Sequence, residues 1–165
     1  MEIIIDGYNF IGRDGGLRGP LEHKRRWLIQ QLAIFREKKD LEVTVVFDGW
    51  RSGVGNEVEE KRGGVRVVFS RLGEKADSVI VRLTRARGSG CVVVTSDREI
   101  RNAVEKFGAA AVTSGEFAEV LRGVDRLYND SEYAEPEFEA SKKGNPRRLS
   151  RADKKRSEVL RKLRS

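Results

Sequence analysis

The sequence contains very little cysteine or histidine. Cys91 and His23 are the only residues of their kinds among 165. One cysteine cannot form an internal disulfide, and one cysteine with one histidine cannot build a structural zinc site. His23 stands beside Lys24, Arg25 and Arg26 in a charged stretch, which argues against a serine–histidine–aspartate triad. We expect Cys91 to be a buried, inert thiol in a reducing compartment.

Long apolar runs and known phosphate-binding loops are also missing. No apolar run approaches the roughly 20 residues of a membrane helix, and the N-terminus lacks the regions of a signal peptide. We therefore expect a cytoplasmic protein without a membrane span. There is no G-x-x-x-x-G-K-[ST] loop, and the glycines from Gly12 to Gly19 lack the G-x-G-x-x-G spacing. Position 8 is Tyr8, where a phosphatase of the haloacid-dehalogenase type would need an aspartate.

The net charge of +7 is concentrated at the C-terminus. Residues 141–165 hold 11 Lys and Arg against 2 acids, so this tail carries +9 and the other 140 residues carry −2. A basic tail on a slightly acidic domain is a common way to hold a polyanion near an active site.

Buried strands alternate with helices along most of the chain. Short runs rich in Val and Ile, without in/out alternation, predict five strands covered on both faces: Ile3–Asp6, Val43–Asp48, Val65–Phe69, Cys91–Ser96 and Ala110–Val112. Apolar residues at helical spacing predict helices at Leu21–Lys38, Ala76–Arg87, Arg98–Phe107 and Phe117–Arg122. This alternation predicts a three-layer α/β/α fold with a mostly parallel sheet of about five strands.

Two regions depart from this rhythm. The glycine-rich segment Trp50–Gly64 is long for a connection, and it is either a mobile flap over the site or a surface excursion without a role. We expect residues 1–125 to form the folded domain, and residues 126–165 to form an acidic linker and a basic, partly helical tail. Ser150 and Asp153 form a capping-box pattern before a basic helix that runs from about Arg151 to Arg164.

Four acids fall at, or just after, the carboxyl ends of predicted strands: Asp6, Asp48, Asp77 and Asp97. In a parallel sheet these ends share one edge, so the carboxylates can converge. Converging carboxylates repel unless a cation lies between them, and oxygen ligands favour Mg²⁺ or Mn²⁺. Each acid also has a structural explanation: Asp97 as a helix cap, Asp77 as a partner of a helix dipole, and Asp48 as a turn residue.

Five motifs in order, I-I-D-G-Y-N, V-V-F-D-G, G-E-K-A-D-S, V-V-T-S-D-R-E and K-G-N-P-R-R-L-S, resemble the YacP-like branch of the NYN domain family in the PIN-like nuclease superfamily. The resemblance covers nearly the whole chain. It implies a PIN-like fold over residues 1–125 and Mg²⁺- or Mn²⁺-dependent cleavage of RNA, which we expect to be endonucleolytic. It implies that Asp6, Asp77 and Asp97 bind metal, with Asp48 as an additional member. Asn9 would position a carboxylate, a water or the scissile phosphate.

One departure from the family concerns Ser78, where some relatives carry a second acid. Metal occupancy then depends on Asp48 or Glu74. Basic residues near the site and in the tail are candidates for binding RNA phosphates: Arg71, Lys75, Arg98, Arg101, Lys142, Lys143, Arg147 and Arg148. Tyr8 and Trp50 either stack on bases or pack in the core. The alternative function is non-catalytic binding of RNA or the ribosome through the basic tail.

Overall fold

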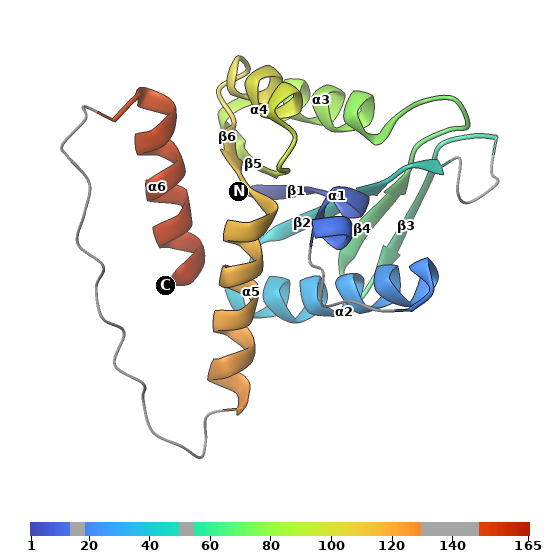
Figure 1. Cartoon of the computed structure of the whole chain (residues 1–165), viewed down its shortest axis with the longest axis horizontal. Coiled ribbons are helices and arrows are strands. Elements are labelled where there is room, and N and C mark those ends of the chain that lie inside the picture. The colour runs from blue at the N-terminus through green and yellow to red at the C-terminus, as the bar shows by residue number, and fades with distance from the viewer. Residues whose placement is uncertain (14–18, 50–54, 130–148) are drawn as a thin grey trace.

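The computed structural model describes residues 1–13, 19–49, 55–129 and 149–165. A six-stranded sheet in the order β3-β4-β2-β1-β5-β6 forms its centre (Figure 1). All neighbouring strands are parallel except β3, which pairs antiparallel with β4. The strands are β1 (Glu2–Asp6), β2 (Glu42–Phe47), β3 (Val58–Arg62), β4 (Val65–Phe69), β5 (Cys91–Val94) and β6 (Ala110–Val112).

Helices cover both faces of the sheet. They are α1 (Gly7–Arg13), α2 (Leu21–Lys39), α3 (Ala76–Arg87), α4 (Arg98–Glu105), α5 (Ser114–Asn129) and α6 (Arg151–Arg164), with a 3₁₀ turn, η2, at Gly88–Gly90. Helices α1, α2, α5 and α6 contribute to one apolar cluster, and α3 and α4 contribute to the other. Figure 1 shows α3 and α4 on the opposite side of the sheet from α2. The three-layer α/β/α class is therefore confirmed.

Strand β1 shows why the strands lack alternation in sequence. Ile3 and Ile5 enter the cluster beneath α2 and α5, while Ile4 enters the cluster beneath α3, and all three are fully buried. Because side chains alternate between faces and both faces are covered, every position must be apolar. The first polar side chain after this run, Asp6, therefore marks the carboxyl edge of the sheet. Cys91 is also buried, as expected.

The sixth strand, β3, is a departure from the sequence prediction. It lies inside the segment 50–64 that we expected to be a loop. Its sequence, V-E-E-K-R, carries no apolar signature because it is a solvent-exposed edge strand, where charges suppress pairing with other chains. Gly63 and Gly64 form its turn into β4 with φ of 55° and 80°, which favours glycine. Residues 50–54 lie outside the described residues.

Two helices also differ from the prediction. Helix α1 begins directly after Asp6, in a stretch where the sequence predicts no helix. Helix α5 runs over Ser114–Asn129, whereas the sequence predicts only Phe117–Arg122. Gly123 does not end α5, because a helical glycine costs only about 1 kcal/mol and Val124 continues the buried face.

The basic helix at the C-terminus is present as predicted. Ser150 caps it by accepting a hydrogen bond from the Asp153 backbone N–H at 3.1 Å. Val159 and Leu163 are buried in the core cluster that α5 and β6 share, and Figure 1 shows α6 beside them. The division at residue 125 stays a prediction, and the expected acidic linker lies outside the described residues. None of the described helices is long and apolar enough to cross a membrane.

Candidate functional site

Asp6 is the most perturbed acid at the carboxyl edge of the sheet. It ends β1 and is only 7% exposed. Its pKa is raised to about 7, chiefly by burial and to a smaller extent by the negative charges of Asp77 and Asp48. Two weak hydrogen bonds act in the opposite direction, from the Asn9 backbone N–H at 3.5 Å and from the Thr95 hydroxyl at 3.4 Å.

Asp77 belongs to the same electrostatic group. It lies in the first turn of α3, which follows β4 through a short loop. Burial raises its pKa, and the charges of Asp97 and Asp48 contribute in the same direction, while Lys75 opposes them. The four acids therefore share one edge of the sheet, as predicted from parallel strand ends, and their charges act on one another.

Asp48 also has a structural role. Its Oδ1 accepts a hydrogen bond of 2.7 Å from the backbone N–H of Ala76, the first residue of α3. The next residue, Gly49, donates its N–H to Ser70 Oγ at 2.9 Å. A Cβ at Gly49 would lie 1.4 Å from the Ser70 carbonyl oxygen, so only glycine fits there. The end of β2 is thus held against the end of β4, with Asp48 directed at the start of α3.

Asp97 caps helix α4. Its Oδ1 accepts hydrogen bonds from the backbone N–H groups of Glu99 at 2.8 Å and Ile100 at 3.4 Å. The helix-cap explanation is therefore correct, and it does not exclude a second role for the other carboxylate oxygen. Asp97 is also linked to Asp6, because its N–H donates to Thr95 Oγ1 at 3.2 Å and that hydroxyl donates to Asp6.

Asn9 joins three elements near the acids. Its side-chain Oδ1 accepts from the Ser96 backbone N–H at 3.0 Å and from Ser114 Oγ at 2.8 Å. Ser96 Oγ in turn accepts from the Ser114 N–H at 3.1 Å. Asn9 on α1 therefore fixes the loop after β5 and the start of α5, which is a positioning role.

Sequence reasoning missed the hydroxyl residues of this network: Ser70, Thr95, Ser96 and Ser114. Ser70 and Thr95 directly follow strands, Ser96 comes one residue later, and Ser114 begins α5, in the motifs V-F-S, V-T-S-D and V-T-S-G. A polar residue immediately after a buried strand was the available signal, since it must find a partner at the crowded edge.

The described residues contain no group of three or more His, Cys, Asp and Glu side chains placed closely enough to hold a metal ion. The described acids thus share one edge and act on one another's pKa, but their carboxylates do not form the close metal-binding cluster that the sequence predicts. Asp48 and Asp97 are held by helix N-termini, and Glu74 lies 3.5 Å from Arg71 and 3.9 Å from Arg82 between their charged atoms. The oxygen-only donors suit a hard cation. Their assignment as metal ligands stays a prediction.

The basic candidates for RNA binding that the structure describes differ in their exposure to solvent. Arg71, Lys75 and Arg98 are exposed near the acidic edge. Arg101 on α4 is half-buried, and within the described part of the chain its Nε has no hydrogen-bond partner. The four tail candidates lie outside the described residues, namely Lys142, Lys143, Arg147 and Arg148. Binding of RNA by each of these residues stays a prediction.

The structure describes one of the two aromatic candidates. Tyr8 packs against Phe47 with ring centroids 5.0 Å apart, and its hydroxyl accepts a 3.0 Å hydrogen bond from Arg25 Nη1. This arrangement favours the packing role of Tyr8 over base stacking. Trp50 lies outside the described residues.

The family sequence model of the YacP-like NYN domain matches residues 3–165 of this chain. The chain belongs to the YacP-like NYN domain family. Among solved structures, it is similar to Rae1 (YacP) from Bacillus subtilis, with 25% identity and a TM-score of 0.65 over 79% of each chain. A single-substitution variant of that protein matches with 24% identity and a TM-score of 0.63, over 98% of this chain and 91% of the other. No curated protein sequence matches.

Membership of the YacP-like NYN family gives the acidic edge a chemical context. The family is nuclease-like and PIN-like, which implies RNA as the substrate. Nucleases of the NYN and PIN-like type generally use divalent metal ions. The edge that carries Asp6, Asp77 and Asp97 is thus the candidate active site.

Proposed function

We propose that this protein is a cytoplasmic ribonuclease that depends on Mg²⁺ or Mn²⁺ and cuts RNA phosphodiester bonds internally. One observation supports the proposal above all others. Asp6 is a buried carboxylic acid at the carboxyl end of β1, one of the two middle strands of the sheet. Its pKa is raised to about 7, chiefly by burial, and the negative charges of Asp77 and Asp48 contribute to this shift. A fold tolerates such a destabilising arrangement where chemistry needs it.

The acids divide the work between chemistry and structure. Asp6, Asp77 and Asp97, with Asp48, would hold the divalent ion, which when bound supplies Lewis-acid catalysis of phosphodiester hydrolysis. Asp48 and Asp97 each commit Oδ1 to a helix, and in the described part of the chain no hydrogen bond reaches their Oδ2 atoms. Asn9 keeps the loop after β5 and the start of α5 in register with Asp6.

Cations beside the acids would hold the RNA backbone. Lys75 immediately precedes α3 and acts electrostatically on Asp77. Arg98 is the first residue of α4, next to Asp97, and is exposed. Phosphate contacts of this kind position the strand without reading its sequence.

The proposal is tested by RNA cleavage in the purified protein. We expect cleavage with Mg²⁺ or Mn²⁺, no cleavage with EDTA, and a loss of at least about a hundredfold in kcat for Asp6→Asn and Asp77→Asn. Asp40→Asn is the matched control, because Asp40 is an exposed acid at the other edge with φ of 49°, which asparagine adopts readily. Full activity in Asp6→Asn, or cleavage that persists in EDTA, would overturn the proposal.

A second candidate is a non-catalytic protein that binds RNA or the ribosome through its basic tail. It is favoured by the basic residues that α6 exposes, namely Arg151, Lys154, Arg161, Lys162 and Arg164. Deleting α6 is a poor test, because Val159 and Leu163 are buried in the core. Substituting Lys154, Arg161 and Arg164 by Gln leaves that contact intact. A binding module then loses RNA affinity and has no cleavage to lose, whereas a nuclease keeps metal-dependent cleavage with a higher KM.

A further inference from the structure

The sheet face beneath α3 changes from apolar to charged toward its amino edge. Ile4, Val46 and Val68 lie in the apolar cluster under α3 and α4. Two residues earlier on each strand, on the same face, stand Glu2, Thr44 and Arg66. These charged and polar residues are unexpected here, because the same face of the sheet is apolar and covered by α3 and α4 two residues further along each strand.

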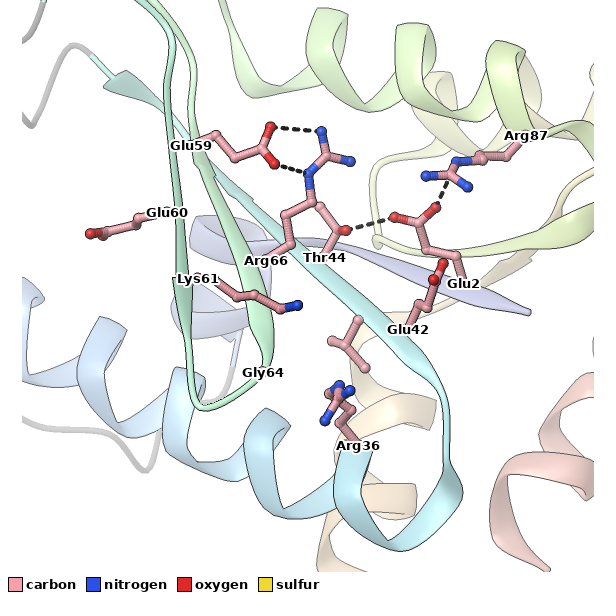
Figure 2. Close-up of a pocket in the computed structure, with 11 residues that line it drawn as sticks. Glu2, Arg36, Glu42, Thr44, Glu59, Glu60, Lys61, Gly64, Arg66 and Arg87 are labelled. Atoms are coloured by element: carbon pink, nitrogen blue, oxygen red, sulfur yellow. Dashed lines mark hydrogen bonds and ion pairs between the residues drawn. The ribbon is translucent and has the colours of Figure 1, made fainter.

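A cavity of about 410 Å³ opens over this charged face (Figure 2). Its polar walls include Glu2, Glu42, Arg36, Lys61, Arg66 and Arg87. The volume falls within the range of small-molecule sites. The cavity lies at the amino ends of β1 and β2, and Asp6 lies at the carboxyl end of β1, so the cavity is separate from the candidate nuclease site.

Glu2 and Glu59 in the cavity wall already have partners, but one oxygen of Glu2 receives no hydrogen bond from the described residues. Glu59 and Arg66 form two hydrogen bonds of 2.7 Å. Glu2 is 5% exposed, and its Oε1 accepts from the Thr44 hydroxyl at 2.6 Å. Its Oε2 lies 3.0 Å from Arg87 Nε, yet it receives no hydrogen bond from the described residues. Arg87 therefore balances the charge of Glu2, but within the described part of the chain this buried oxygen still lacks a donated hydrogen bond, which a ligand N–H group can supply.

Three other charged groups of the wall have no hydrogen bond or ion pair among the described residues, namely Arg36, Lys61 and Glu42. Figure 2 shows the Lys61 ammonium group directed into the cavity, whereas Glu60 points away from it. Glu42 is the register partner of Glu2 on the neighbouring strand, so two carboxylates stand side by side. The cavity wall therefore has two cations without a partner among the described residues, Arg36 and Lys61. At a separate place it has two neighbouring acids, Glu2 and Glu42, whose carboxylate oxygens can accept further hydrogen bonds.

We propose that this cavity binds a small zwitterion, an amino acid or short peptide with a free ammonium and a free carboxylate. The ligand carboxylate lies between Arg36 and Lys61, and the ligand ammonium group lies between Glu42 and Oε2 of Glu2, which receives no hydrogen bond from the described residues. A ligand with both charges supplies partners to Arg36, Lys61 and Glu42 at once, whereas a simple anion leaves Glu42 without a counter-charge. The β3–β4 turn passes close to Arg36, since a Cβ at Gly64 would lie 2.6 Å from its Nη1.

The test is an NMR titration of the ¹⁵N-labelled full chain with glycine, glycylglycine and triglycine, which space the two charges differently. We expect at least one of them to give saturable shifts at residues of β2, β3 and β4 beside the cavity. N-acetylglycine lacks the ammonium group and glycinamide lacks the carboxylate, so each should bind at least about tenfold more weakly. No saturable shift with any of the three zwitterions, or equal binding of N-acetylglycine or glycinamide, would overturn the proposal.

Variants locate the binding within the protein. Lys61→Met and Glu42→Gln should each weaken the best zwitterion by about tenfold or more, because each removes one charged contact. Arg62→Met is the control, since it removes the same charge from the same strand, at an exposed residue that pairs with Glu60 at 2.8 Å. Unchanged affinity in both Lys61→Met and Glu42→Gln would contradict the assignment of the cavity. RNA cleavage, measured in parallel, is independent of this result.

Discussion

The carboxylate of Asp48 accepts a 2.7 Å hydrogen bond from the backbone N–H of Ala76. This contact joins the end of β2 to the first turn of α3. It places the Asp48 side chain against Ala76, the residue that directly precedes Asp77. The acids at this edge thus hold helix N-termini and repel one another at the same time. We therefore expect removal of an acid to affect both stability and the proposed activity, and the two effects can be measured separately.

Asp48→Asn and Asp48→Ala separate the structural role from the charge. Asparagine keeps an acceptor for the Ala76 N–H, whereas alanine removes it. We expect Asp48→Ala to lose about 1 kcal/mol in the free energy of unfolding, as for a lost helix cap, and Asp48→Asn to lose less. Urea denaturation gives the stabilities, and RNA cleavage gives the effect of charge. Equal stability of the two variants would show that the hydrogen bond does not hold α3.

The raised pKa of Asp6 predicts an unusual dependence of stability on pH. The folded protein binds the Asp6 proton more tightly than the unfolded chain does, so ionising Asp6 destabilises the fold. We expect the metal-free protein to lose stability as the pH rises from about 4 to about 7, by no more than about 1.4 kcal/mol per pH unit from this residue. Urea denaturation in EDTA at several pH values measures the slope.

The variant Asp6→Asn isolates that contribution. It should flatten the slope in part, because the pKa of Asp77 is raised in the same direction and its contribution remains. Asp40→Asn, at an exposed position, should leave the slope of the parent protein unchanged. A parent slope that Asp6→Asn does not reduce would mean that Asp6 ionises normally in the folded state.

Asn9 is expected to matter for stability as well as for activity. Asn9→Ala leaves the Ser96 N–H and the buried Ser114 hydroxyl without their acceptor, which should cost about 1–3 kcal/mol. Asn9→Asp keeps an acceptor and should retain more of the stability. Asn102→Ala, on the exposed side of α4, is the control and should change stability by less than about 0.5 kcal/mol. If the Asn9 and Asn102 variants unfold alike, the network does not hold these elements together.

Much of the fold can be predicted from the sequence because its central strands are buried on both faces. Runs such as Ile3–Ile5 report that burial directly, and the bounds of α3 follow from its apolar spacing. Strand β3 cannot be recognised in this way, since an exposed edge strand contains charges where a buried strand contains Val and Ile. The extent of α5 is also hidden, because its buried face continues past Gly123.

The candidate site is predictable only in part. Strand ends identify the edge and its acids, because parallel strands point the same way. The sequence does not show which oxygen of Asp48 or Asp97 a helix N-terminus uses, since these contacts depend on the packing of α3 and α4. It also gives no sign of the charged cavity at the amino edge, which arises where β1 and β2 place Glu2 beside Glu42.

The contact between α6 and α5 gives the last prediction. Arg156 Nε donates to both oxygens of Glu116 at 3.1 Å, and Glu116 also accepts from the backbone N–H of Thr113 at 2.9 Å. Burial opposes ionisation of Glu116, but the bonds from Arg156 and Thr113 prevail and lower its pKa. We expect Arg156→Met to lose about 1–2 kcal/mol at pH 7.

The pH dependence distinguishes this ion pair from simple loss of packing. Because the folded pKa of Glu116 lies below its unfolded value near 4.5, its contribution is complete above that value and is lost as the pH falls through the folded pKa. The deficit of Arg156→Met should therefore shrink in acid. Lys162→Met removes an exposed pair with Glu158, and it should cost less than about 0.5 kcal/mol at either pH. A deficit in Arg156→Met that is the same at pH 7 and in acid would assign the effect to packing of the arginine side chain.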